Sequence, residues 1–159
     1  MPEKPIKLTP EEAERDPETK RLLLNLKKVF KKYIQKRDRY RSVFPDNSIR
    51  NVSISHFYGA AGSPNEAMAY NEKNVHLMSN RLHKEYHEIN PLPYVRFMIE
   101  KYGIEEVERM EKESQRTHKL SRQEIIELTN HYAKLIKSLG EVNRLKEFKA
   151  KKEKHERVK

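Results

Sequence analysis

The chain has 159 residues, of which 35% are hydrophobic and 36% are charged, so it suits one modest domain with solvated extensions. The absence of cysteine excludes structural disulfides, thiolate chemistry and cysteine-based zinc sites. No stretch approaches the ~18–20 apolar residues that a membrane span needs, and the acidic N-terminus looks like neither a signal peptide nor an Arg-rich transit peptide.

The formal net charge of +10 is concentrated in two segments. Residues 20–41 carry ten Lys or Arg and one acid, and residues 144–159 carry eight Lys or Arg and three acids. Residues 1–19 have a net charge of −3 and residues 42–143 a net charge of −1. A near-neutral body with two basic appendages indicates a polyanionic partner better than a high pI alone does.

The N-terminal part of the chain predicts an arm followed by a helix. Residues 1–17 hold four prolines and are expected to form an extended arm. Asp16 and Pro17 suit a helix start, as cap and first helical residue. We predict a helix over 20–42, within a basic amphipathic segment at 18–45. The predicted helix carries one apolar stripe, formed by Leu22, Leu26, Val29, Phe30, Tyr33 and Ile34.

The predicted body, residues 46–142, begins with an alternating stretch. Residues 51–58 place β-branched and aromatic side chains at period two, which predicts a strand. Ser63 and Glu66 then match a capping box, so a helix is predicted over 64–89. Its buried stripe would consist of Val75, Met78, Leu82 and Ile89.

A second capping box predicts the last helix of the body. Ser121 and Glu124 form the box, and the helix is expected over 121–140, where Gly140 stands at the C-cap position. Its stripe contains Ile125, Ile126, Leu128, Tyr132, Leu135, Ile136 and Leu139. Residues 143–159 are expected to form a basic tail, because no apolar stripe continues beyond Phe148.

The stretch between these two helices fits both a strand and a helix. Val95, Phe97 and Ile99 alternate as in a strand, but the same run also fits the helical period. We interpret it as a strand pair near 94–100 and 105–111 that turns at Gly103. With the strand near 51–58, this interpretation gives an α+β fold; the alternative is a mostly α-helical one.

The order of these features resembles the thioredoxin-like domain family shared by several mitochondrial ribosomal proteins and a small accessory subunit of respiratory complex I. The matching residues are "EYHEINPLPYVRFMIEKYG", in which Asn90-Pro91 would open the second strand, and "LSRQEIIEL", which would begin the final helix. The resemblance covers roughly residues 51–140. It implies a small thioredoxin-like sheet and an architectural protein of a mitochondrial assembly in the matrix, not an oxidoreductase.

No pattern in the sequence favours catalysis. His76, His83 and His87 would share one face of the helix predicted at 64–89, but we interpret that face as a polar flank, because a closed metal site needs a defined ligand set. The turn "GAAGS" lacks the lysine of a P-loop, and the acidic run at 105–113 reads as a solvated face. We therefore predict no enzymatic activity, no catalytic or metal-binding residues, no cofactor and no small-molecule substrate.

The two basic segments are the candidate binding surface. Their cations would contact nucleic-acid phosphates, and Tyr33, Tyr40 and His56 would add stacking on RNA bases. The predicted RNA-binding residues are Lys27, Lys28, Lys31, Lys32, Lys36, Arg37, Arg39, Arg41, Lys149, Lys151, Lys152 and Lys154.

The sequence thus predicts a non-enzymatic structural component of a mitochondrial ribosome, with rRNA and neighbouring ribosomal proteins as partners. A soluble accessory subunit of a respiratory-chain complex is the alternative that the resemblance leaves open. A helical adaptor that binds no nucleic acid is a third hypothesis, favoured if 88–108 is helical.

Overall fold

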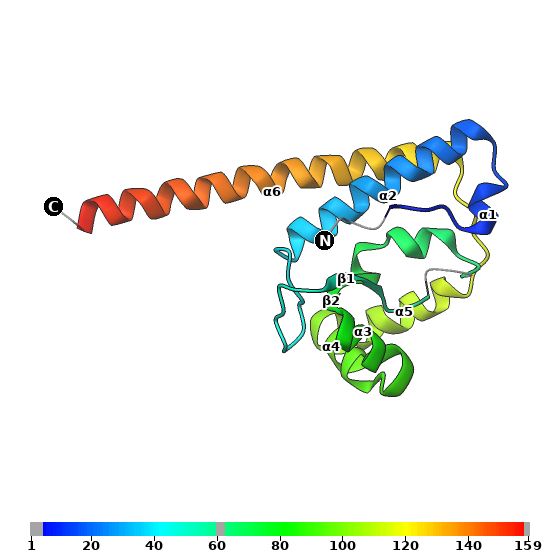
Figure 1. The fold of residues 1–159 in the computed structure, drawn as a ribbon, viewed down its shortest axis with the longest axis horizontal. Helices are drawn as coiled ribbons and strands as arrows, with labels where there is room; N and C mark the ends of the chain where they lie inside the picture. Colours follow the sequence, from blue (N-terminus) through cyan, green and yellow to red (C-terminus); the bar gives the residue numbers. More distant parts are fainter. Residues whose placement is uncertain (1–4, 60–62, 158–159) are drawn as a thin grey trace.

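Two long helices pack side by side and organise the molecule (Figure 1). The computed structural model describes residues 5–59 and 63–157. Helix α2, Pro17–Arg37, lies along the first part of α6, Arg122–Arg157, and the sheet and shorter helices gather beside this pair. The C-terminal part of α6 projects past every other element (Figure 1). No helix within the described ranges is long and apolar enough to cross a membrane.

Helix α2 confirms the predicted basic helix, with boundaries shifted toward the N-terminus. Asp16 caps it by accepting a hydrogen bond from the Thr19 backbone N–H at 3.0 Å. The helix ends earlier than predicted because a Schellman motif closes it: the Tyr40 N–H bonds to the Gln35 carbonyl at 2.8 Å, and the Arg39 N–H to the Lys36 carbonyl at 3.2 Å.

One hydrophobic cluster joins α2 to α6. Leu23, Leu26 and Ile34 of α2 are fully buried in it. Tyr132 of α6 packs against Phe30 of α2, with ring centroids 4.8 Å apart, and its hydroxyl donates a hydrogen bond to the Tyr70 carbonyl. Tyr70 belongs to a short 3₁₀ turn in the connection between the two strands of the sheet, so the cluster also fixes the helix pair on the body.

The sheet has two antiparallel strands in the described residues. Strand β1, Val52–His56, confirms the predicted strand at 51–58, and it pairs with β2, Val75–Ser79, with Ile54 opposite Leu77. The α+β class is therefore confirmed.

The helix predicted over 64–89 is wrong for most of its length. Two 3₁₀ turns, η1 at Glu66–Tyr70 and η2 at Glu72–Asn74, lead into strand β2, and helix α3 covers only Asn80–Lys84 before a π turn, η3, at Glu85–Ile89. Asparagine side chains cap the two turns in place of the predicted Ser63–Glu66 box. All five residues of β2 are buried, and such a run shows neither helical nor alternating periodicity. Ile89, predicted to be buried, is 74% exposed.

The strands predicted near 94–100 and 105–111 are helices. Helix α4 covers Leu92–Tyr102 and helix α5 covers Ile104–Ser114. Val95, Phe97 and Ile99, which we expected to alternate in a strand, are only half-buried. Tyr94 and Met98 are buried one turn apart, as are Val107 and Met110, which is the helical period. Together with buried side chains of β2, α3 and the loop after α2, these residues form a second hydrophobic cluster. A thioredoxin-like sheet is not present in the described residues.

Helix α6 confirms the helix predicted at 121–140 and extends well beyond it. The capping box forms as expected: the Glu124 N–H bonds to Ser121 Oγ at 3.2 Å, and the Ser121 N–H bonds to Glu124 Oε2 at 2.7 Å. Gly140 is not a C-cap, because the helix continues through it to Arg157. The segment predicted as a basic tail is thus helical as far as the structure describes it.

Gly103 holds the bend between α4 and α5, with φ 85° and ψ 153°. This backbone conformation is essentially restricted to glycine. We expect Gly103→Ala to lower the free energy of unfolding by about 1–3 kcal/mol. Gly140→Ala is the matched control, because glycine inside a helix is unfavourable, and it should raise stability by about 0.5–1 kcal/mol. A Cβ would meet no atom within 4 Å at either site, so urea unfolding of the two variants isolates the backbone effect.

His76 links β2 to α4 and should make stability depend on pH. It is fully buried, its ring nitrogens contact the hydroxyls of Tyr94 at 3.3 Å and Tyr102 at 2.8 Å, and burial lowers its pKa from 6.5 to about 2. The unfolded chain therefore binds more protons between these two pH values, and stability falls as the pH falls below 6.5.

Between pH 6.5 and pH 5, we expect this histidine to remove about 2 kcal/mol of stability. The measurement is urea unfolding at both pH values for the wild type and for His76→Gln, which cannot titrate. Equal losses in the two proteins would contradict this assignment.

Candidate nucleic-acid interface

Helix α2 carries its lysines in two rows. Lys28 and Lys32 lie one turn apart, both exposed, on the face opposite the buried stripe. Lys27 and Lys31 are half-buried and line a cavity on the other flank. Lys36, near the helix end, is also half-buried. The predicted cations of α2 therefore do not form one continuous surface.

Arg37 was predicted to bind phosphates, but the structure places it inside the molecule. Its guanidinium donates to both carboxylate oxygens of Asp38 at 2.7 and 2.9 Å, and to the carbonyls of Glu72 and Val75, each at 2.6 Å. Asp38 Oδ2 also accepts the Leu77 N–H at 2.9 Å. Arg37 thereby ties the end of α2 to strand β2, and its donors are used within the fold.

Arg39 and Arg41 follow α2 in the turn that closes it, and both are exposed. Arg39 has a φ of 57°, in the left-handed region that the Schellman motif requires after the helix cap. At the other end of the chain, Lys149, Lys151, Lys152 and Lys154 are exposed on the projecting part of α6. These cations have no described ion pair, so they remain available to a partner.

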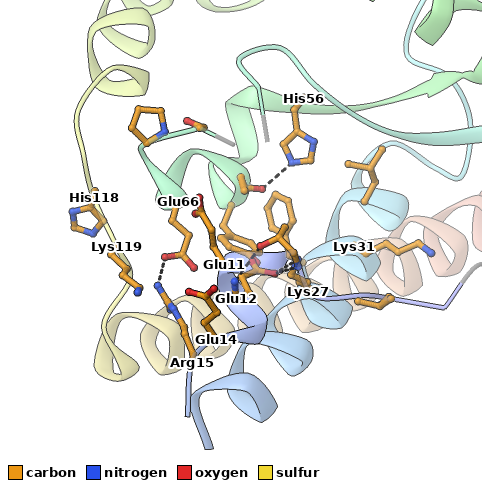
Figure 2. Close-up of a pocket in the computed structure, with 18 of the residues that line it drawn as sticks. Glu11, Glu12, Glu14, Arg15, Lys27, Lys31, His56, Glu66, His118 and Lys119 are labelled. Atoms are coloured by element: carbon orange, nitrogen blue, oxygen red, sulfur yellow. Dashed lines mark hydrogen bonds and ion pairs between the residues drawn. The ribbon is translucent and has the colours of Figure 1, made fainter. Parts of the chain in front are cut away.

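A cavity of about 790 Å³ lies beside α2. Its walls come from the N-terminal segment, the flank of α2 with Lys27 and Lys31, strand β1, turn η1 and the segment before α6. Figure 2 shows the charged residues around it, with Glu12 meeting Lys27 and Arg15 meeting Glu66. The volume is in the range of ligand pockets, and the lining mixes cations, acids and apolar side chains.

Two of the acids at this cavity, Glu12 and Glu66, are paired with cations. Arg15 contacts Glu66 at 2.5 Å and donates to the Leu120 carbonyl at 3.1 Å, and Glu66 Oε2 also accepts the Leu120 N–H at 2.9 Å. Glu12 Oε2 lies 2.8 Å from Lys27 Nζ. The second oxygen of Glu66 is buried without a described hydrogen-bond partner. The cavity wall therefore includes two ion pairs that join the N-terminal segment to α2 and to turn η1.

The histidines do not form a metal site. His56 lines the cavity; its Nε2 donates to the Ala69 carbonyl at 3.1 Å, and burial lowers its pKa, so the ring is neutral. His76 is buried in the core on β2, whereas the rings of His83 and His87 lie next to each other, with centroids 4.6 Å apart and planes tilted by 49°. No group of three or more His, Asp or Glu in the described residues is arranged to hold a metal ion.

One histidine contact has the geometry of a nucleophile and its base, but the burial contradicts that role. Ser55 Oγ lies 2.8 Å from His87 Nε2. Ser55 is fully buried, and no described group orients the far side of the His87 ring. The contact joins β1 to the π turn after α3. The "GAAGS" turn lies mostly outside the described residues.

The residues proposed to stack on bases are mostly unavailable. Tyr33 is buried and its hydroxyl donates to Glu72 at 2.5 Å, and His56 is half-buried against Ala69. Only Tyr40 of the three is exposed, at 54%. Of these three residues, then, one could stack on an unstacked base; Phe148 on the projecting part of α6, at 69% exposure, is a second exposed ring.

Sequence reasoning missed Glu12, Arg15 and Glu66 as residues of one site. The partners of Arg15 lie 51 and 105 positions away along the chain, so no spacing rule could have connected them. The one available signal was the contrast between the acidic N-terminal segment and the basic helix that follows it.

Arg37 and Lys32 should behave differently when their charge is removed. We expect Arg37→Gln to lower the free energy of unfolding by about 3 kcal/mol, because it leaves Asp38 buried without its counter-charge. Lys32→Gln, at an exposed position of the same helix, should change stability by less than about 0.5 kcal/mol. Urea unfolding measures both, and an Arg37→Gln protein as stable as the wild type would show that the buried pair is dispensable.

Comparison with known proteins identifies a family. A family model described as "Bacteriophage Lambda NinG protein" matches residues 15–143, which run from the end of the N-terminal segment through most of α6. No curated protein and no solved structure matched the chain.

The family match corrects the earlier resemblance. The chain is not a thioredoxin-like mitochondrial ribosomal protein, and the match to a phage family overturns both the ribosomal and the respiratory-chain predictions, together with the mitochondrial matrix location. The strand predicted to begin at Asn90-Pro91 is wrong, because these residues precede helix α4. Since the model matches well over half of the chain, the protein belongs to the NinG family.

Proposed function

We propose that this protein is a non-enzymatic binder of duplex nucleic acid that contacts the phosphate backbone. The observation that carries the proposal is the set of exposed cations without described ion pairs at two places, on α2 with its closing turn and on the projecting end of α6. The eight cations are Lys28, Lys32, Arg39, Arg41, Lys149, Lys151, Lys152 and Lys154. Phosphate contacts of this kind give affinity without sequence readout.

The choice of a duplex follows from the side chains that are absent from the surface. Proteins that hold single strands combine cations with aromatic rings on which bases stack. Here the aromatic residues of α2 are buried, and among the described residues the exposed aromatic rings of the proposed surface are two, Tyr40 after α2 and Phe148 on the projecting part of α6. A duplex keeps its bases stacked inside and presents phosphates, which is what exposed lysines and arginines can contact.

The projecting helix extends the reach of the basic surface. An α-helix rises 1.5 Å per residue, so the 36 residues of α6 span about 54 Å. Its outer part, from Val142 on, is exposed along its whole described length and packs on no other element. We propose that this part lies along a duplex while α2 contacts the same backbone nearer the body.

Removing the outward lysines of α2 tests the proposal. The affinity of the wild type for a fluorescent duplex DNA should fall steeply between about 50 and 200 mM salt. Lys28→Gln combined with Lys32→Gln should weaken binding and reduce the slope of log K against log salt by about 2, because each phosphate contact contributes ~0.9. Fluorescence anisotropy measures both quantities.

Arg96→Gln combined with Lys112→Gln is the matched control. These two residues are exposed cations on α4 and α5 without described ion pairs, so the control removes the same charge elsewhere. An equal loss of affinity in the control would show that binding depends on net charge and not on the lysines of α2, which would contradict the proposed contact surface. Tighter binding to a single strand of the same length would contradict the choice of a duplex.

A protein-binding adaptor is the second candidate, and one observation favours it. Residues 92–114 are helical apart from Gly103, so most of the 88–108 stretch meets the condition attached to the adaptor hypothesis. Ile89, just before α4, Leu92, at its start, and Ile104, just after its end, are exposed at 74%, 55% and 50%. Absence of binding to any nucleic acid at low salt would leave the adaptor as the better proposal.

A further inference from the structure

The acidic N-terminal segment lies on the basic helix. Residues 9–14 contain a short helix, α1, at Pro10–Ala13, with Glu11, Glu12 and Glu14 in and next to it. All three acids line the cavity beside α2. The segment therefore brings negative charge to the flank of α2 that carries Lys27 and Lys31.

Glu12 is the contact between the two. Its carboxylate is turned inward, the residue is only 8% exposed, and Oε2 lies 2.8 Å from Lys27 Nζ. A charge-assisted contact of this length is what a phosphate oxygen would make with the same ammonium group. The backbone carbonyl of Lys7 accepts from Lys27 Nζ as well, at 3.4 Å. An anion from the chain itself thus occupies the position at which Lys27 would hold a phosphate.

The segment is held by few contacts. Glu12 is the one buried residue among positions 5–14, and Leu8 packs only partly against the cluster between α2 and α6. Arg15 anchors the segment at its far end, through Glu66 and the Leu120 carbonyl. Segments with so little buried apolar surface open at low free-energy cost. The family match begins at Arg15, so this acidic segment lies outside the part of the chain that the family model covers.

We propose that residues 9–14 act as a built-in competitor for phosphates, which must leave Lys27 before a duplex engages the cavity flank of α2. This inference rests on the proposed nucleic-acid binding and adds its regulation. The exposed row of α2 binds first, and the cavity flank joins when the segment is displaced. Because only the displaced fraction can use Lys27, the segment lowers the apparent affinity.

Glu12→Gln tests the competition with the fold preserved. Glutamine at this position keeps the capping box with Thr9, whose N–H bonds to Glu12 Oε2 at 2.8 Å, so the change removes the charge and retains the local shape. We expect Glu12→Gln to bind duplex DNA several-fold more tightly than the wild type. The salt slope should steepen by about 1, the signature of one added phosphate contact.

Two further variants separate local competition from net charge. Glu108→Gln, at an exposed position on α5 without a described ion pair, makes the same change of charge far from α2. Glu12→Gln combined with Lys27→Gln should return the slope to that of the wild type. Equal gains from Glu12→Gln and Glu108→Gln, or a gain that survives removal of Lys27, would overturn the competition while leaving the proposed function intact.

Hydrogen exchange of the wild-type chain gives an independent readout. Saturation with duplex DNA should reduce the protection of the backbone amides of Glu12 and Ala13, which donate to Thr9. Unchanged or increased protection would overturn the proposal. If neither the wild type nor Glu12→Gln binds duplex DNA at low salt, both the competition and the proposed function fail together.

Discussion

The packing of α2 on α6 around Phe30 and Tyr132 is the contact on which the rest of the structure depends. These rings lie between two helices whose facing residues are about a hundred positions apart, and Tyr132 also reaches the turn before β2 through its hydroxyl. Leu23, Leu26 and Ile34 complete a fully buried strip along α2. The chain has few apolar residues with which to build a core. This buried strip uses them to join α2, α6 and the turn that contains Tyr70.

The end of α2 transmits this packing to the sheet. The Asp38 carboxylate accepts a hydrogen bond from the Leu77 N–H and two from the guanidinium of Arg37. The end of α2 and strand β2 therefore share one hydrogen-bond network. The Schellman turn then directs Arg39 outward. One turn of backbone thus separates a cation that belongs to the core from a cation that faces solvent. Charge alone could not distinguish them in the sequence.

The features that were predicted correctly have local causes, although two other local patterns, the Ser63–Glu66 box and the C-cap at Gly140, were wrong. Asp16, Pro17 and the Ser121–Glu124 box start their helices as predicted, because a cap needs only neighbours three residues away. The period-two pattern of β1 was also sufficient. Strand β2 could not be recognised, since its burial on both faces comes from elements on either side of it.

The error at 94–111 has a different cause. The apolar residues there fit two periods, and a weak family resemblance decided between them. Gly103 could not settle the choice, because a glycine suits a turn between two strands as well as one between two helices. The turn predicted there is present, with φ 85° and ψ 153°, but it joins two helices. The cavity was not predicted from the sequence, for a third reason. Arg15, Glu66 and Leu120 meet only in the folded chain, so the cavity could not be read from spacing.

The structure shows that the acidic N-terminal segment and the basic helix α2 are in contact, which the sequence alone did not indicate. An acidic arm before a basic helix would be unremarkable if the two were solvated separately, because charges farther apart than about 8 Å are screened at physiological salt. Here Glu12 and Lys27 are in contact and largely shielded from water, so their attraction is screened little. The formal charge of the cavity flank of α2 therefore overstates what a partner meets there, whereas Lys28, Lys32 and the lysines at the end of α6 are exposed.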